Sequence, residues 1–298
     1  MTIEKETFNV AVIATMSSGK STTLNAMLGV SLLPSMNEAC TATIYKIDDV
    51  DELDHFQARF ITTSGNTSEW EKLEEQGNIL ELWNSSGYET IEIKGDFPHI
   101  ANYQKLISFF DTPGPNNSSD KSHSEITHNI ITKSKFGFVL CVMNASQFGV
   151  DDERVLLSNL LKDLSEKDQK TQIVFAVNKM DQLDLENGEL PSQLVYKIRN
   201  YLIKLGYCRP KVVPVMSLIS LEIRQLIEAY KSNQEVPFSK RKQKKLLADI
   251  GYLFEFSDEY INASVNTREQ NKHLEAAKQQ ARHVDKTKII NLNFDKKN

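Results

Sequence analysis

The sequence FNVAVIATMSSGKSTTLNAMLG, residues 8–29, joins an apolar run, a short loop and a helical pattern. Residues 8–13 are mostly apolar and β-branched, which predicts a buried strand. A helix is predicted from Lys20 to Leu28, because Gly29 is a residue type favoured just past a helix end. The loop between them ends in Gly19-Lys20-Ser21. Apart from its first position, it matches the phosphate-binding pattern G-x-x-x-x-G-K-[ST] in the strand–loop–helix context that this pattern requires.

The loop is expected to bind nucleotide phosphates through Ser18, Gly19, Lys20, Ser21 and Thr22. Backbone N–H groups of the turn and of the helix N-terminus would surround the β- and γ-phosphates. Lys20 would add a positive charge, and the Ser21 hydroxyl would be a Mg²⁺ ligand.

The first glycine of the pattern is replaced by Ala14. This replacement is acceptable if the φ angle of Ala14 is negative, because only a positive φ requires glycine.

A second motif follows Leu106 to Phe110, an apolar run predicted as a strand. Asp111-Thr112-Pro113-Gly114 fits the pattern D-x-x-G at the carboxyl end of that strand, where ligands bind in open α/β sheets. Asp111 would hold Mg²⁺ through a water molecule. The Gly114 amide would donate to the γ-phosphate and so respond to its hydrolysis.

A third motif, Asn178-Lys179-Met180-Asp181, follows the apolar run Ile173 to Val177 and fits the pattern N-K-x-D. The Asp181 carboxylate can pair with the N1–H and N2–H₂ donors of guanine, and adenine has no such donor pair. Sites built around buried polar partners reject analogues that lack them, so the motif predicts GTP rather than ATP. Asn178 would brace the loops near the purine, and the stem of Lys179 would lie on the ring.

A weaker signal comes after the apolar run Lys211 to Val215. A backbone N–H group at Ser217 would meet the O6 atom of guanine. Alone this signal is weak, but it falls at the end of another predicted strand, like the motifs before it.

Apolar runs alternate with helical patterns through most of the chain, which predicts a mostly parallel, doubly wound α/β sheet covered on both faces, as in P-loop GTPases. The other predicted strands are 44–47, 55–61, 88–94 and 138–143, and the other predicted helices are 67–82, 122–133, 152–164, 191–204 and 217–231. In the helix 67–82, Ser68 and Glu71 have the spacing of a capping box.

Two parts of the chain are expected. Residues 1–232 would form the nucleotide-binding domain, with an inserted α+β segment at about 45–105 between the two switch motifs. Residues 233–298 would be a helical appendage that follows a linker with Pro237. It starts with the basic run Lys240 to Lys245, which we interpret as a solvated helix face rather than a lipid contact.

Composition places limits on the partners. The formal net charge is −5, from 35 basic and 40 acidic residues, so no global attraction to nucleic acid or anionic lipid is expected. The widely spaced Cys40, Cys141 and Cys208 are typical of reduced thiols in a cytoplasmic protein. The longest apolar run is far below the roughly 20 residues of a membrane span. We therefore expect a cytoplasmic protein without a nucleic-acid partner.

The segment ATMSSGKSTTLNAMLGVSLLPSMNEACTATIYKI, together with DTPG and NKMD, resembles the GTPase domain of the dynamin superfamily, above all bacterial dynamin-like proteins. The resemblance covers about residues 6–232 and includes the long segment between Thr41 and Asp111. It implies that Thr41 is the switch I threonine, which binds Mg²⁺ and orients the attacking water, with Thr43 the weaker candidate. It also implies that Ser17 acts in catalysis beside Lys20, with a monovalent cation (K⁺ or Na⁺) in place of an arginine finger.

The same resemblance implies partners. Pro115 stands where Ras-like proteins have a water-orienting glutamine, so slow hydrolysis is expected until two GTP-bound domains pair as a homodimer. Dynamin-like proteins act on membranes through a long stalk and a lipid-binding tip, for which about 60 residues are too few. The chain is therefore expected to be a GTPase domain of a longer protein or a short form. Peripheral contact with the inner membrane face is a possible property of such a protein, but these residues alone do not indicate it.

Two other interpretations stay open. In the first, the chain is a nucleotide-gated binding module that holds GTP or GDP, recruits a partner through its switches and hydrolyses negligibly; Pro115 and Ala14 favour it slightly. In the second, it is a Ras-like assembly or ribosome-associated GTPase, against which the long insert and the lack of a basic RNA-binding domain count.

Overall fold

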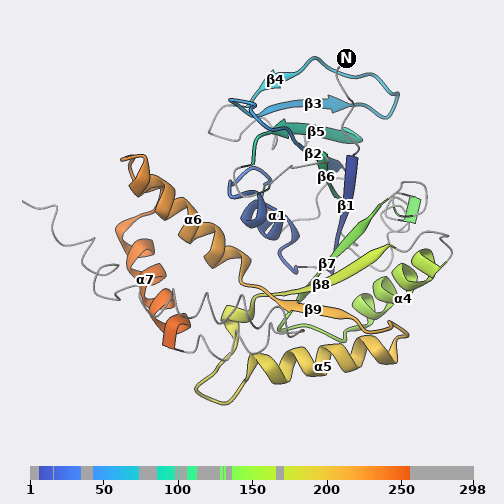
Figure 1. Cartoon of the computed structure of the whole chain (residues 1–298), viewed down its shortest axis with the longest axis vertical. Helices are drawn as coiled ribbons and strands as arrows, with labels where there is room; N and C mark the ends of the chain where they lie inside the picture. The colour runs from blue at the N-terminus through green and yellow to red at the C-terminus, as the bar shows by residue number, and fades with distance from the viewer. Residues whose placement is uncertain are drawn as a thin grey trace, which may run out of the picture.

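One nine-stranded sheet forms the centre of the protein, in the order β4-β3-β5-β2-β6-β1-β7-β8-β9 (Figure 1). The structure is a computed structural model that describes residues 7–15, 17–34, 43–73, 86–97, 100, 106–112, 128–129, 131, 136–165 and 171–255. The strands are β1 (Thr7–Ala14), β2 (Ile44–Asp49), β3 (Gln57–Ile61), β4 (Glu71–Lys72), β5 (Thr90–Gly95), β6 (Leu106–Asp111), β7 (Phe138–Asn144), β8 (Gln172–Asn178) and β9 (Lys211–Pro214). The helices are α1 (Lys20–Leu28), α4 (Asp151–Ser165), α5 (Pro191–Lys204), α6 (Ser217–Lys231), α7 (Lys240–Glu255) and the short 3₁₀ helix η1 (Met180–Gln182).

The strands β6, β1, β7, β8 and β9 are all parallel to their neighbours within this half of the sheet. Helix α1, with α6 beside it, covers one face, and α4 and α5 cover the other (Figure 1). Each face has its own apolar core. The predicted doubly wound, mostly parallel α/β fold is therefore confirmed.

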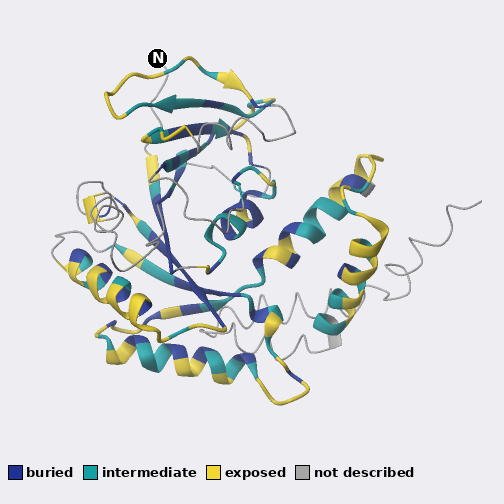
Figure 2. Ribbon diagram, turned by 180° about the vertical axis from the view of Figure 1, so that it is seen from behind, coloured by how far each residue is buried: buried dark blue, intermediate teal, exposed yellow. Residues whose placement is uncertain are grey.

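Strand β1 shows why its sequence is apolar throughout. Successive side chains of a strand point to opposite faces. Val10 and Val12 lie in the core under α1, whereas Ala11 and Ile13 lie in the core under α4 and α5. Because both faces of β1 are covered, no position from 10 to 14 is left for a polar side chain, and the dark central strands of Figure 2 show this burial.

The other half of the sheet comes from the inserted segment. Strand β2 runs antiparallel to β6 and parallel to β5, and β3 pairs antiparallel with β5 and β4. These strands extend the sheet beyond β6, at the top of Figure 1. The described part of the insert contains strands and turns.

The predicted helix 67–82 is wrong for its described part. Thr67 bridges Ile61, and Glu71–Lys72 forms the edge strand β4. Ser68 does not cap a helix, because its hydroxyl accepts from the Phe60 N–H at 3.1 Å and donates to the Glu69 carbonyl. Pairing with β3 outweighs the local helical pattern. Residues 74–82, and most of the predicted helix 122–133, lie outside the described residues.

Among the residues that the structure describes, none of the helices has the length and apolar character that crossing a bilayer would take.

The first turn of α4 contains a buried acid. Asp151 and Asp152 are exposed at the helix N-terminus, where negative charge is favourable. Glu153 is 1% exposed, and its Oε1 atom accepts the Gly149 N–H at 2.8 Å. Its Oε2 atom has no hydrogen-bond partner in the described structure. Burial raises the pKa of Glu153 to about 7, against the opposing effect of the Gly149 hydrogen bond.

Glu153→Gln is expected to stabilise the protein at high pH. A carboxyl group whose pKa rises on folding, here from 4.5 to about 7, favours the folded state less as pH increases through that window. At pH 8 the glutamine variant should gain about 2–3 kcal/mol relative to its difference at pH 4.5. Urea unfolding at both pH values measures this gain. Asp152→Asn, one residue away and exposed, is the control, and equal pH profiles for Glu153→Gln and wild type would contradict the prediction.

Candidate functional site

The sequence motifs meet at one edge of the sheet. Ala14 ends β1, Asp111 ends β6 and Asn178 ends β8, and these strands run in the same direction. Their carboxyl ends therefore lie together, where α/β sheets bind ligands. Helix α1 begins at this edge with Lys20, and α6 begins there with Ser217.

The loop before α1 has a demanding backbone. Gly19 has a φ of 83° and Ser17 a φ of 54°, both in the left-handed region. A Cβ atom on Gly19 would lie 2.7 Å from the Asn178 Nδ2 atom, so glycine is required there by both conformation and contact. Ala14 is part of the extended strand β1 and is not among the residues with positive φ. The first glycine of the sequence pattern is therefore not needed in this chain.

Asn178 joins the phosphate-binding loop to α6. Its Nδ2 atom donates to the Ser18 carbonyl at 2.8 Å, and its Oδ1 atom accepts the Ser217 N–H at 3.0 Å. Asn178 is 3% exposed, so both bonds are protected from water. The bracing role predicted for this residue thus has a concrete form, because one amide side chain holds two loops together.

Thr23 and Ser217 add a second link between the same loops. Their hydroxyl groups are 2.8 Å apart, and Thr23 also donates to the Gly19 carbonyl at 2.9 Å. Sequence reasoning missed Thr23. The available signal was its position four residues after Gly19, which puts it on the side of α1 next to the phosphate-binding loop.

Asn144 is a further residue that the motifs did not predict. It ends β7, and its side chain reaches the Ser17 carbonyl at 3.5 Å and the Ser146 N–H at 3.0 Å. Its signal was a polar residue directly after an apolar run, the position shared by Asp111 and Asn178.

Lys20 and Asp111 form a buried ion pair across the site, in which the Lys20 Nζ atom donates to Asp111 Oδ1. Asp111 is 3% exposed, and burial raises its pKa, while the charge and hydrogen bond of Lys20 oppose the rise. The cation and the carboxylate that the sequence assigns to phosphate and Mg²⁺ are thus in direct contact. Ser18 is 1% exposed, and its hydroxyl group has no hydrogen-bond partner in the described structure.

Asp181 lies in η1, which follows Lys179, a residue with a φ of 66°. It is half-buried, and burial raises the pKa of its carboxyl group. Asp249 and Glu222 raise the pKa further through their negative charges, whereas Lys179 and a backbone hydrogen bond lower it. The acid predicted to read guanine therefore faces other acids, from α6 and α7.

The Ser217 N–H group is already used by Asn178. The sequence had predicted that this N–H group meets a purine oxygen. In this conformation it is not free to do so. Helix N-termini leave N–H groups without intrahelical acceptors, and in the described structure those of Leu218 and Ile219 have no acceptor. These are the available donors at the start of α6.

Some predicted residues cannot be placed. Thr41 and Gly114 lie outside the described residues, so their roles stay predictions. Thr43, the weaker switch candidate, is buried and its hydroxyl donates to the Tyr88 carbonyl at 2.8 Å. That bond ties Thr43 to the inserted sheet.

The site residues fit a magnesium nucleotide by their chemistry. Ser21 and Asp111 supply the oxygen ligands that Mg²⁺ prefers. Lys20 and the N-terminus of α1 supply positive charge for phosphates.

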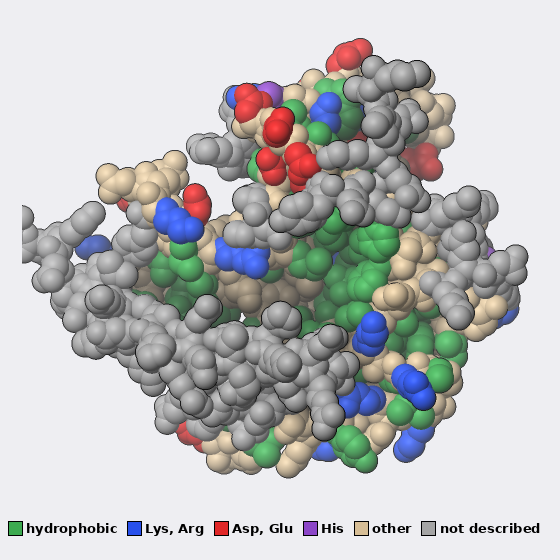
Figure 3. Space-filling model, in the orientation of Figure 1, with side chains coloured by type: hydrophobic (Ala, Val, Ile, Leu, Met, Phe, Trp, Pro, Cys, Tyr) green, Lys and Arg blue, Asp and Glu red, His purple; other side chains and the backbone are tan. Residues whose placement is uncertain are grey.

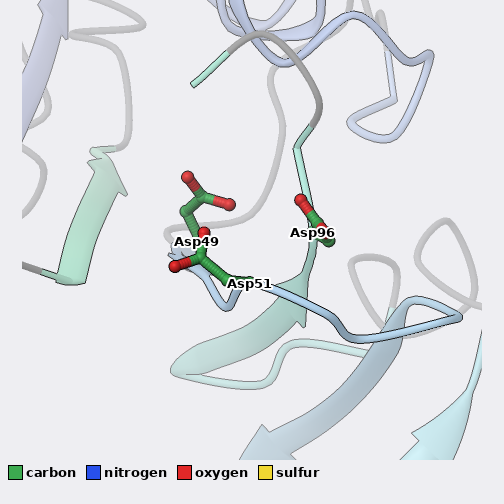
Figure 4. A group of neighbouring side chains, drawn as sticks. All are labelled: Asp49, Asp51 and Asp96. Carbon is green, nitrogen blue, oxygen red and sulfur yellow. The ribbon is translucent and has the colours of Figure 1, made fainter. Parts of the chain in front are cut away.

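A separate acidic group lies at the far end of the inserted sheet. Ligand atoms of Asp49, Asp51 and Asp96 lie within 4.8 Å of one another (Figure 4). Asp49 accepts the Phe97 N–H at 3.0 Å, and Asp96 accepts the Glu52 N–H at 3.0 Å. Figure 3 shows acidic side chains gathered over this top part of the molecule. Asp49 and Asp96 are thus used by the local backbone, and we assign no metal to this group.

The sequence model of the Dynamin family matches residues 10–180, more than half of the chain. Among curated proteins, the clamp-binding protein CrfC of Escherichia coli (strain K12) is 23% identical over 273 residues. That alignment covers 70% of this chain and 36% of the relative. The chain therefore spans about a third of the relative's length.

Solved structures of similar fold include two of an oligomerised bacterial dynamin pair, described for the long-range sensing and tethering of membranes. One has a TM-score of 0.53 at 16% identity and covers 92% of this chain and 41% of its own. The other has a TM-score of 0.54 at 17% identity, with coverages of 93% and 52%. Era from Aquifex aeolicus, bound to GDP and AlF₄⁻, has a TM-score of 0.42 at 18% identity, with coverages of 79% and 58%.

Gly19→Ala is expected to destabilise the protein more than Gly65→Ala. Both glycines have a φ of 83°, but a Cβ atom on Gly65 would meet nothing within 4 Å. The conformation alone should cost about 1–2 kcal/mol in each variant. Gly19→Ala should lose a further 1–3 kcal/mol or so, because the displaced Asn178 amide leaves buried groups unpaired. Urea unfolding gives both free energies, and equal losses would show that Asn178 does not constrain this loop.

Proposed function

The chain belongs to the dynamin family, and we propose that it binds GTP with Mg²⁺ and hydrolyses it. The observation that carries this proposal is that the Asn178 side chain donates one hydrogen bond to the phosphate-binding loop and accepts another from the start of α6. These bonds bring the residues suited to phosphate and those suited to guanine into one site. Family membership supports both nucleotide binding and hydrolysis in general.

Each residue then has a role that follows from its position. Lys20 leaves Asp111 for the phosphates, because a nucleotide offers it a larger negative charge. Asp111 and Ser21 would hold Mg²⁺, Asp111 through a water molecule and Ser21 through its hydroxyl group. When bound, Mg²⁺ neutralises charge that develops on the phosphate oxygens. Asp181 accepts from the guanine edge, and the stem of Lys179 covers the ring.

The proposal also assigns catalytic roles to two residues. Thr41 would orient the attacking water through its carbonyl, and Ser17 would act with a monovalent cation near the phosphates. Ser17 has a positive φ and a carbonyl held by Asn144, and such strained residues are frequent at functional sites. Pro115 has no side-chain group to orient a water. We therefore propose that pairing of two nucleotide-bound domains completes the site.

Coupling to a membrane or to a larger assembly is a further proposal. The dynamin pair of similar fold is described for sensing and tethering membranes. Because this chain spans about half of those proteins or less, we propose that it supplies the GTPase part of such an activity.

GTP turnover should require Lys20 and should rise with protein concentration. In potassium buffer with Mg²⁺, wild-type turnover per molecule is expected to increase as domains pair. Lys20→Ala should lose at least about 100-fold, in the range found when one preorganised charge is removed. Phosphate release across a concentration series measures both effects.

Lys46→Ala is the matched control, because Lys46 also pairs with carboxylates, Asp48 and Glu92, but lies in β2 outside the site. It should keep wild-type turnover. Thermal melts of both variants identify any loss of fold, since Lys20→Ala leaves Asp111 buried without its cation. Tight GTP binding with no turnover at any concentration would overturn the hydrolase and leave a nucleotide-gated binding module.

A further inference from the structure

A cavity of ≈ 620 Å³ lies between η1, α6 and α7. This volume is in the range of small-molecule sites. Asp181 lines the cavity from η1, Leu218 and Ile219 line it from the start of α6, and Lys245 and Asp249 line it from α7. It therefore brings together the predicted guanine acceptor, the first residues of α6 and a helix that none of the nucleotide motifs includes.

Helix α7 is packed firmly enough to serve as a wall. It lies beside α6 (Figure 1), with Leu246 only 2% exposed. Lys242 of α7 pairs with Glu222 of α6 at 2.8 Å. Tyr252 packs against the core under α4 and α5, which also includes Met180 of η1. The last turns of α7 thus pack against the same core as η1, which contains Asp181.

Asp249 is the acid of this wall that has no hydrogen bond or ion pair within the described residues. It is half-buried, whereas the other acid of the cavity, Glu222, is already paired with Lys242. Asp249 and Asp181 therefore face one cavity as two carboxylates of like charge. Such an arrangement is favourable when a ligand places N–H donors between them.

Guanine has the edge that two carboxylates can share. It offers N1–H and an exocyclic amine with two hydrogens. Asp181 can accept N1–H and one amine hydrogen, which leaves the second amine hydrogen pointing away from Asp181. We propose that Asp249 of α7 accepts this remaining hydrogen, so that α7 forms part of the base site and reads the exocyclic amine. This inference rests on the proposed binding of GTP.

The test compares GDP with inosine 5′-diphosphate (IDP), which lacks the exocyclic amine. Dissociation constants of both nucleotides are measured by calorimetry with Mg²⁺ for the full chain and its Asp249→Ala variant. The ratio of the IDP constant to the GDP constant should fall about ten- to 150-fold in the variant, as expected for one hydrogen bond to a charged group. The ratio is the readout because removing a negative charge also changes the affinity for both nucleotides together.

Glu222→Gln is the control, since it makes the same change of charge in the same cavity and keeps an acceptor for Lys242. Its ratio should equal that of the wild type. Asp249→Asn, which keeps the shape of the side chain, is the second variant and should lower the ratio in the same direction. An unchanged ratio in both Asp249 variants, or an equal fall in Glu222→Gln, would overturn the inference while GTP binding stands. A wild type that binds neither GDP nor IDP would overturn the proposed function and this inference together.

Discussion

The side chain of Asn178 holds together two pieces of backbone on which the site depends. Its hydrogen bonds to the Ser18 carbonyl and to the Ser217 N–H cross from one loop to another, at the end of a buried strand. A buried donor or acceptor that loses its partner costs about 1–3 kcal/mol. Neither loop can therefore move away from β8 without leaving polar groups unpaired. The same hydrogen bonds require a glycine at position 19, because any side chain there would occupy the position of the Asn178 amide.

The pair between Lys20 and Asp111 has a different meaning. Buried ion pairs are weak contributors to stability, because the loss of hydration offsets the attraction. Here burial raises the pKa of Asp111 in spite of the adjacent cation. An apolar pair of similar size would fill the same space without that cost. The proposed nucleotide would separate these charges, with Lys20 toward the phosphates and Asp111 toward Mg²⁺.

The sequence predicted those features of the fold that depend on residues close together along the chain. The strand β1, the helix α1 and its end at Gly29 were predicted within a residue or two, because apolar periodicity and turn chemistry are local. The residues at strand ends were also predicted, since parallel strands bring their carboxyl ends to one edge. The predicted helix 67–82 was wrong in its first residues, because the pairing of the edge strand β4 with β3 cannot be inferred from the local sequence pattern. The use of the Ser217 N–H by Asn178 is equally non-local.

The position of α7 is the largest feature that the sequence left open. Its amphipathic pattern predicts a buried face but does not indicate which element packs against that face. Asp249 is also far from Asp181 along the chain. In the folded protein both acids line one cavity. If both acids bind the same base, nucleotide affinity depends on the packing of α7 against α6 and η1. By thermodynamic linkage, the bound nucleotide then stabilises that packing by the same free energy. Nucleotide binding would then change how firmly α7, a helix outside the nucleotide motifs, packs against α6 and η1.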